Sequence, residues 1–257
     1  MTPLPINESS SIAPVQFLAE TADPAVLAVI TAIEGPSYRP LGAMMALTAD
    51  GHRVGSLSSG CVESDIALHA AEALSAGEVR VLRYGRGSPF VDIQLPCGGG
   101  LEITLVPNPD RQVLAVAVQK FGNRVACALT IETSTGDLGI DAAVSASVET
   151  GRQGETFFVR LDPEIFFYVL GKGPEAITFA ALVQSAGFPN ILCSPDAETL
   201  EAAARAGSAV MHLTSARFPT EIAPDSRSAV VLFFHDHDWE PPILQTALAS
   251  PAFYIGA

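Results

Sequence analysis

Two cysteines on glycine-rich turns are the residues best suited to chemistry in the first half of the chain. Cys61 lies in residues 57–63 (LSSGCVE), where a short apolar stretch meets a segment with helical spacing. The positive end of that helix would favour a thiolate over a thiol. Cys97 lies in residues 95–100 (LPCGGG), where no packing need calls for three successive glycines. Thiolates on such turns suit an anionic heterocycle, a soft metal or a carried sulfur atom.

A purely structural role is the alternative for each cysteine. Cys61 would then be a small buried residue at a tight helix start, and Cys97 a turn residue of a hairpin. No general base is identifiable beside Cys61, because the nearest histidines are His52 and His69, and His69 falls two turns along the predicted helix. The two turns together, with an arginine-bearing loop upstream, favour a shared ligand-holding or sulfur-holding site over covalent catalysis. The candidate residues of this site are Arg39, Gly60, Cys61, Glu63, Cys97, Gly98 and Gly99.

A glycine-rich turn in the second half matches a dinucleotide-binding pattern. Residues 171–176 (GKGPEA) fit G-x-G-x-x-A between a predicted strand and a predicted helix. Gly171 and Gly173 permit close approach of a pyrophosphate to the backbone. Ser194 stands where an acidic residue is usual after the next strand, and Asp196 follows two residues later. Because Asp196 can hold a ribose hydroxyl or cap the next helix, both nucleotide binding and a Rossmann-like shell with a lost or changed ligand stay open.

A histidine pair follows the fourth predicted strand of the second half. His235 and His237 alternate along residues 234–238 (FHDHD) and so share one face of an extended segment. Open parallel sheets bind ligands at this carboxyl edge, which makes the two histidines candidate metal ligands or a proton-handling pair. No third ligand is identifiable, and the alternative is a histidine that caps the backbone at the strand end.

The composition is that of a globular protein with one large domain or two ordinary ones. The 257 residues are 48% hydrophobic and 16% charged, and no apolar run approaches the roughly 20 residues needed to span a bilayer. Fourteen basic residues against 28 acidic ones give a net charge of −14. This charge argues against nucleic acid or an anionic membrane as a partner.

The cysteine pattern and the N-terminus predict a cytoplasmic protein. The four cysteines contain no CxxC pair and no disulfide-dense spacing, and Cys127 and Cys193 lie in apolar runs that are expected in the core. Residues 1–14 have neither the positive region nor the apolar region of a signal peptide. We expect them to form a disordered lead-in.

The predicted fold class is α/β, with an N-terminal α+β domain followed by a C-terminal Rossmann-like doubly wound parallel sheet. In the domain expected at 15–160, strands surround one helix at 61–76; the expected strands are 25–33, 43–48, 53–57, 79–84, 91–95, 101–106, 113–118, 124–132 and 156–161. The polar stretch 133–154 has no firm assignment. Residues 161–257 alternate apolar strands with helical segments, which is typical of a parallel sheet.

Three motifs resemble the XdhC/CoxI family of xanthine dehydrogenase accessory proteins. They are residues 35–45 (GPSYRPLGAMM), 55–63 (GSLSSGCVE) and 95–99 (LPCGG). The second half is similar to the Rossmann-like C-terminal domain of that family in its glycine turn, its His-Asp-His strand end and its closing residues 253–256 (FYIG). Ser194 departs from the family pattern, because many relatives have Asp there.

The resemblance implies a cofactor chaperone rather than an enzyme. Such proteins bind molybdenum cofactor, protect it while a cysteine desulfurase supplies its terminal sulfur, and pass it to an apo molybdenum hydroxylase of the xanthine dehydrogenase or carbon monoxide dehydrogenase type. On this basis Cys61 and Cys97 would contact cofactor or sulfur, and Arg39 with the Gly171–Gly173 turn would hold its anionic parts. A homodimer is left open.

Two other functions compete with the chaperone. One is an NAD(P)-dependent oxidoreductase that uses Gly171, Gly173 and Asp196. The other is a metal-binding regulator that uses His235 and His237.

Overall fold

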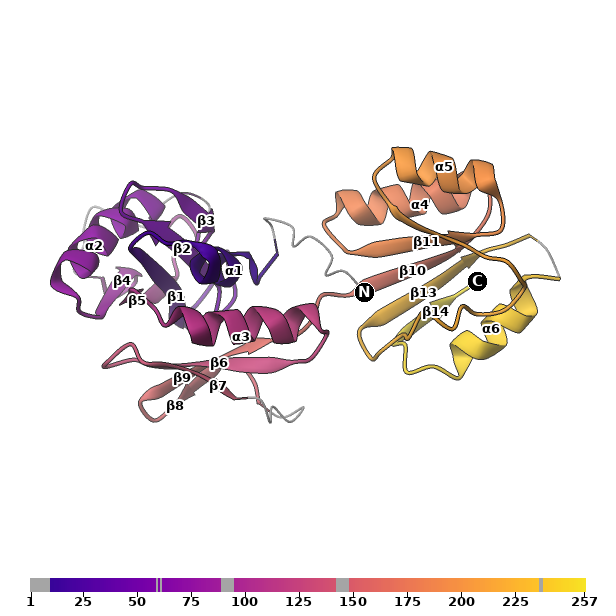
Figure 1. Ribbon diagram of the computed structural model, residues 1–257. Helices are drawn as coiled ribbons and strands as arrows, with labels where there is room; N and C mark the ends of the chain where they lie inside the picture. Colours follow the sequence, from indigo (N-terminus) through magenta and orange to yellow (C-terminus); the bar gives the residue numbers. More distant parts are fainter. Residues whose placement is uncertain (1–9, 59, 61, 89–94, 142–147, 236–237) are drawn as a thin grey trace. The chain divides into compact units, whose positions relative to one another are not determined.

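The computed structural model describes the chain apart from residues 1–9, 59, 61, 89–94, 142–147 and 236–237. It divides into two compact units, Met1–Pro163 with two sheets and Glu164–Ala257 with one (Figure 1). The domain boundary expected from the sequence, after residue 160, lies three residues before this division. None of the helices in the described part of the chain combines the length and apolar character needed to cross a membrane.

The first unit is built on a five-stranded antiparallel sheet in the order β3-β2-β1-β5-β4. The strands are β1 (Ala25–Glu34), β2 (Met44–Thr48), β3 (Arg53–Gly55), β4 (Arg80–Gly85) and β5 (Gly100–Pro107). The central strand β1 is largely apolar because both faces of the sheet are covered. Leu27 and Val29 belong to one core cluster, whereas Val26, Ala28 and Ile30 belong to the other, as alternation along a strand requires.

One face of this sheet packs on helix α2 (Glu63–Ala76), which begins two residues after Cys61. Ile66, Ala70 and Ala73 of this helix are buried at helical spacing. Gly77 ends the helix in the left-handed conformation, with φ of +69°.

The other face of the sheet packs on α1 (Ala13–Glu20), α3 (Arg111–Gly122) and a second sheet. This second sheet has the order β7-β6-β9-β8 and contains β6 (Cys127–Glu132), β7 (Leu138–Asp141), β8 (Gly151–Gln153) and β9 (Thr156–Leu161). Strands β7 and β8 lie in the stretch that had no assignment from the sequence. The expectation of strands around a single helix was therefore wrong, because the unit has two sheets and three described helices.

Two local predictions in this unit were also wrong. Residues 113–118 form part of helix α3, because Asp110 caps it by accepting hydrogen bonds from the N–H groups of Gln112 and Val113. The stretch is apolar on every side, so its periodicity could not separate strand from helix. The disordered lead-in expected at 1–14 also runs too far, because Ile12 and Pro14 are buried where α1 begins.

The second unit confirms the Rossmann-like prediction. Its five parallel strands have the order β12-β11-β10-β13-β14; they are β10 (Phe166–Gly171), β11 (Asn190–Ser194), β12 (Ala209–His212), β13 (Ser228–Phe233) and β14 (Tyr254–Gly256). Helices α4 (Pro174–Ser185) and α5 (Ala197–Arg205) cover one face, and α6 (Glu240–Leu248) covers the other (Figure 1). The strand order reverses beside β10, the place where such sheets bind ligands.

Candidate functional site

The loop between β1 and β2, residues 35–42, forms one wall of the site. Main-chain hydrogen bonds close its base, since Gly42 N–H donates to Ile30 O (2.9 Å) and Ile30 N–H donates to Ala43 O (3.0 Å). Within the loop, the Ser37 hydroxyl donates to the Arg39 carbonyl oxygen at 2.6 Å. The loop is thus anchored at its base and presents Tyr38, which is 71% exposed.

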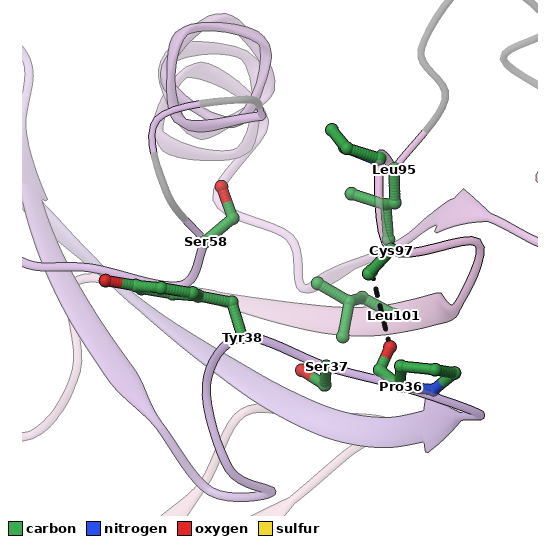
Figure 2. A pocket seen from close by; sticks show the side chains of 8 residues that line it. Pro36, Ser37, Tyr38, Ser58, Leu95, Cys97 and Leu101 are labelled. Carbon is green, nitrogen blue, oxygen red and sulfur yellow. Dashed lines mark hydrogen bonds between the residues drawn. The ribbon is translucent and has the colours of Figure 1, made fainter.

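The Cys97 turn packs directly against this loop. The exposed Cys97 thiol donates a hydrogen bond to the Pro36 carbonyl oxygen, with a sulfur–oxygen distance of 3.4 Å (Figure 2). A Cβ on Gly99 would lie 2.0 Å from the same oxygen, so only glycine fits between the turn and the loop. Gly98 has a φ of +71°, and a Cβ on Gly100 would lie 2.9 Å from a neighbouring carbonyl oxygen.

The expectation that no packing need accounts for these glycines was wrong. Gly99 and Gly100 permit close contact between segments that are distant in sequence, and Gly98 permits a left-handed backbone. The sequence alone could not reveal this, because the atoms that exclude a Cβ belong to other parts of the chain.

The Cys61 turn is the second wall of the site. Cys61 itself lies outside the described residues, but its neighbours are defined. Leu57 and Val62 are fully buried and anchor the turn in the core of the first unit. Gly60 is exposed and has a φ of +95°, and a Cβ added to it would have no atom within 4 Å.

Glu63 ties this turn together at the start of α2. The residue is only 6% exposed, and its carboxylate accepts hydrogen bonds from Ser58 N–H (2.7 Å), Ser58 Oγ (2.7 Å) and Val62 N–H (3.2 Å). Burial raises the pKa of Glu63, but the hydrogen bonds from Ser58 and neighbouring groups lower it by more, so this carboxyl titrates below its ordinary value. The carboxylate predicted to contact a cofactor is therefore engaged in shaping the turn.

The loop and the two turns meet at a pocket of about 230 Å³ (Figure 2). Ser58, which precedes Cys61 by three residues, lies in this pocket with Cys97. Its lining residues are Pro36, Ser37, Tyr38, Ser58, Leu95, Pro96, Cys97 and Leu101. We call it the cysteine pocket. The pocket brings the two cysteine-bearing turns together, and the prediction that both sulfur atoms share it stays a prediction.

Most arginines near these turns are neutralised by carboxylates. Arg83 pairs with Glu34 at 2.5 Å, Arg86 approaches the same carboxylate at 3.5 Å, and Arg80 pairs with Glu72. Arg39 differs from them. Its Nε is buried without a hydrogen-bond partner, and no carboxylate of the described residues pairs with it.

Two main-chain groups of the glycine turn in the second unit are engaged within the chain, because Lys172 N–H donates to Phe233 O and Gly173 N–H donates to Thr199. A Cβ on Gly171 would lie 2.7 Å from Phe233, so this glycine permits close packing of β10 on β13. The Gly173 N–H, at the start of α4, donates to Thr199 Oγ1 at 2.9 Å. The Asp196 carboxylate accepts hydrogen bonds from Thr199 N–H (2.8 Å) and Thr199 Oγ1 (2.6 Å), which lower its pKa.

Asp196 is therefore the N-cap of α5, one of the two roles that the sequence left open. Ser194, at the usual position of the ribose-binding acid, is fully buried and its hydroxyl accepts a hydrogen bond from Asp196 N–H at 3.1 Å. Thr199, which sequence reasoning missed, connects the glycine turn to this cap. No local pattern marks such a threonine, because it acts on a turn 26 residues away.

Only one histidine of the predicted pair lies in the described part of the chain. His235 is exposed just after β13, and His237 lies outside the described residues. Among the residues that the structure does describe, no group of three His, Cys, Asp or Glu side chains is placed to hold a metal ion. A metal site at this edge stays a prediction.

The other two cysteines are core residues, as predicted. Cys127 and Cys193 are fully buried. Burial raises the pKa of both thiols, and that of Cys193 rises to about 12. Neither thiol is suited to hold a ligand.

Both units match models of one protein family. The model of the XdhC and CoxI family matches residues 18–85, and the model of the XdhC Rossmann domain matches residues 167–257. The chain belongs to the XdhC and CoxI family. The first matched range contains the 35–42 loop and the Cys61 turn, whereas Cys97 lies between the two ranges.

Two named proteins are similar in sequence to this XdhC-family chain. It is 32% identical over 233 residues to the molybdenum cofactor insertion chaperone PaoD of Escherichia coli (strain K12), a match that covers 91% of this chain and 66% of that protein. A probable xanthine dehydrogenase subunit from Bacillus subtilis (strain 168) is 49% identical over 49 residues, or 19% of this chain and 15% of that one. The chain thus spans just under two thirds of PaoD.

A solved structure shares the fold. It is described as a xanthine dehydrogenase from Bacillus halodurans, and it matches with a TM-score of 0.80 at 22% identity. The match covers 96% of this chain and 81% of the other. At this identity the likeness establishes the shared fold.

Proposed function

We propose that this chain is a chaperone that binds molybdenum cofactor and delivers it to a molybdenum hydroxylase. The observation that carries the proposal is the cysteine pocket, in which the Cys97 thiol and the turn that bears Cys61 meet. Support also comes from the relative PaoD, which is named a molybdenum cofactor insertion chaperone. Its sequence is similar to this chain along most of the chain's length.

The chemistry of the pocket suits the metal end of such a cargo. A thiolate is a soft ligand that can contact molybdenum or carry a sulfur atom. The apolar side chains Leu95, Leu101 and Pro36 form much of the wall and would limit the access of water to a labile sulfido group. Cys97 is exposed, so cargo can reach it without rearrangement of the core.

The remaining turn residues would serve the same end of the cargo. Gly60 and Gly98 have no atom within 4 Å of an added Cβ, so the backbone of both turns can approach a ligand closely. Within this proposal, Cys61 supplies the second sulfur, a cysteine desulfurase is the sulfur source, and an apo hydroxylase in the cytoplasm receives the cargo. Glu63 contributes by holding the Cys61 turn rather than by direct contact.

An oxidoreductase that uses the second unit has less support. The Gly173 N–H and the Asp196 carboxylate both bind Thr199, and Ser194 is buried. A dinucleotide would have to displace these internal hydrogen bonds, each of which contributes about 0.5–1.5 kcal/mol.

Retention of the cofactor by the purified chain tests the chaperone proposal. Anaerobic gel filtration after mixing with molybdenum cofactor should give co-elution of molybdenum with the wild-type chain. Cys97→Ser and Cys61→Ser should each weaken retention about tenfold or more, since loss of a metal-site contact has effects of this size. Cys193→Ala, which removes a buried thiol in the other unit, is the matched control and should retain the cofactor.

Thermal unfolding of each variant checks that the fold is intact. The proposal fails if the wild-type chain retains no molybdenum. It also fails if both variants at the pocket retain as much molybdenum as the Cys193→Ala control.

A further inference from the structure

A second and larger pocket, of about 420 Å³, lies next to the cysteine pocket in the first unit. It is enclosed by the second part of the 35–42 loop, the start of α1, the end of β3 and strand β9. Its lining residues are Ser10, Ser11, Pro14, Arg39, Pro40, Leu41, Gly42, Ala43, Met44, Gly55, Ser56, Thr150, Val159, Arg160 and Leu161. We call it the arginine pocket.

The charge of the arginine pocket is opposite to that of the chain as a whole. Its charged lining residues are Arg39 and Arg160, and no acidic residue of the described part of the chain lines it, although the chain has 28 acidic and 14 basic residues. Arg160 Nε donates to both oxygens of Asp162 at 2.9 Å, and its Nη1 donates to Val148 O at 3.0 Å. Arg160 is thus held in place and largely balanced.

Arg39 supplies the unbalanced charge. No carboxylate of the described residues pairs with it, and its buried Nε lacks an acceptor. A buried donor on a charged group is costly when it is unpaired. The protein nonetheless keeps this guanidinium in a pocket, which points to an anion from outside the chain as its partner. The guanidinium fork matches the oxygen atoms of a phosphate and binds them in pairs.

The two pockets are lined by neighbouring residues of the same segments. Tyr38 lines the cysteine pocket and Arg39 lines the arginine pocket, and consecutive Cα atoms are about 3.8 Å apart. Likewise, Ser58 lines the cysteine pocket and Ser56 lines the arginine pocket. The cysteine pocket is smaller than the roughly 300–1,000 Å³ of ordinary small-molecule sites, whereas the arginine pocket falls within that range. Leu95 and Leu101 of the cysteine pocket belong to one core cluster, whereas Met44 and Val159 of the arginine pocket belong to the other.

We propose that the arginine pocket binds the phosphate monoester of a pterin cargo, with the phosphate on Arg39. The identity of the cargo rests on the proposed function. The anion site itself rests on Arg39 and the lining of its pocket, and so it can be tested separately.

Fluorescence titration with the metal-free, oxidised pterin of the cofactor tests the phosphate site without the metal. The wild-type chain should bind the intact pterin phosphate about tenfold or more tightly than the same pterin after phosphatase treatment, as expected for a charged hydrogen-bond pair. Arg39→Met should bring this ratio close to one, and Arg39→Lys should give an intermediate ratio. Arg53→Met removes an exposed arginine that lines neither pocket, and it should keep the wild-type ratio.

Three results would overturn the inference. One is equal binding of the two pterins by the wild-type chain. Another is an unchanged ratio in Arg39→Met. The third is binding of adenosine monophosphate as tight as that of the pterin phosphate, which would remove the assignment to a pterin. Because the probe has no metal, these outcomes are independent of whether the chain retains molybdenum.

Thermal unfolding separates a binding role of Arg39 from a structural one. Inorganic phosphate should raise the Tm of the wild-type chain and leave that of Arg39→Met unchanged. Without phosphate, Arg39→Met should have a Tm equal to or above that of the wild type, since it removes an unpaired buried donor and keeps the apolar stem. A lower Tm without phosphate, together with an equal phosphate-induced rise in both proteins, would assign Arg39 to the fold.

Discussion

Replacement of Glu63 by glutamine should loosen the turn that carries Cys61 without changing its size. In the native turn, Glu63 Oε1 accepts from Ser58 N–H and Ser56 Oγ, and Oε2 accepts from Ser58 Oγ and Val62 N–H. The serine hydroxyls can rotate toward a new partner, but the two backbone N–H groups cannot. Glutamine replaces one oxygen by an NH₂ group, so one buried N–H loses its acceptor whichever way the amide is oriented.

The cost can be worked from these contacts. A buried donor left unpaired costs about 1–3 kcal/mol. Loss of the negative charge at the first position of α2 adds about 0.3–1 kcal/mol. We expect Glu63→Gln to lower the free energy of unfolding by about 2 kcal/mol. For a unit of 163 residues this corresponds to a Tm lower by about 4–8 °C.

The loss should also depend on pH. The folded-state pKa of Glu63 lies below its ordinary value of 4.5, so the carboxylate stabilises the folded state above that pH. The stabilisation is lost as the pH falls through the folded-state pKa. Because glutamine does not titrate, the difference between wild type and Glu63→Gln should be constant from pH 6 to 8 and should shrink below pH of about 4.5.

Urea unfolding followed by circular dichroism at several pH values measures this difference. Glu78→Gln is the matched control, because Glu78 is exposed in the same unit. The reasoning is refuted if Glu63→Gln is no more destabilising than Glu78→Gln at pH 7. A difference that grows as the pH falls below 4.5 would refute it equally.

Two further predictions concern the Cys97 turn and the core thiols. Gly99→Ala should destabilise the chain by about 2–3 kcal/mol in urea unfolding, because its Cβ would lie 2.0 Å from Pro36 O. Gly98→Ala, with no atom within 4 Å but a φ of +71°, should lose only about 1–2 kcal/mol through backbone strain, and a larger loss for Gly98→Ala would contradict the packing. Iodoacetamide at pH 8 should modify the exposed Cys97 and spare the buried Cys193, whose pKa is raised to about 12, until urea unfolds the chain; mass spectrometry showing early modification of Cys193 would exclude this burial.

The Rossmann-like unit could be predicted from the sequence because its elements are marked locally. The apolar run that became β10, the glycine turn after it and the segment that became α4 follow one another without interruption. In the first unit the local sequence signals for helix and strand were ambiguous. The apolar residues 113–118 suit a strand or a helix equally, and the decision came from the cap at Asp110 and from packing against α1.

The sequence by itself singled out Cys97 and its glycines as candidate site residues, through residue type and turn composition. Tertiary structure alone decided how these residues pack and which groups they contact. The contact of Gly99 with Pro36 and the hydrogen bond from Gly173 to Thr199 each join segments far apart in the chain. A local pattern contains no information on such pairs, because they form only when packing of the apolar faces brings the segments together.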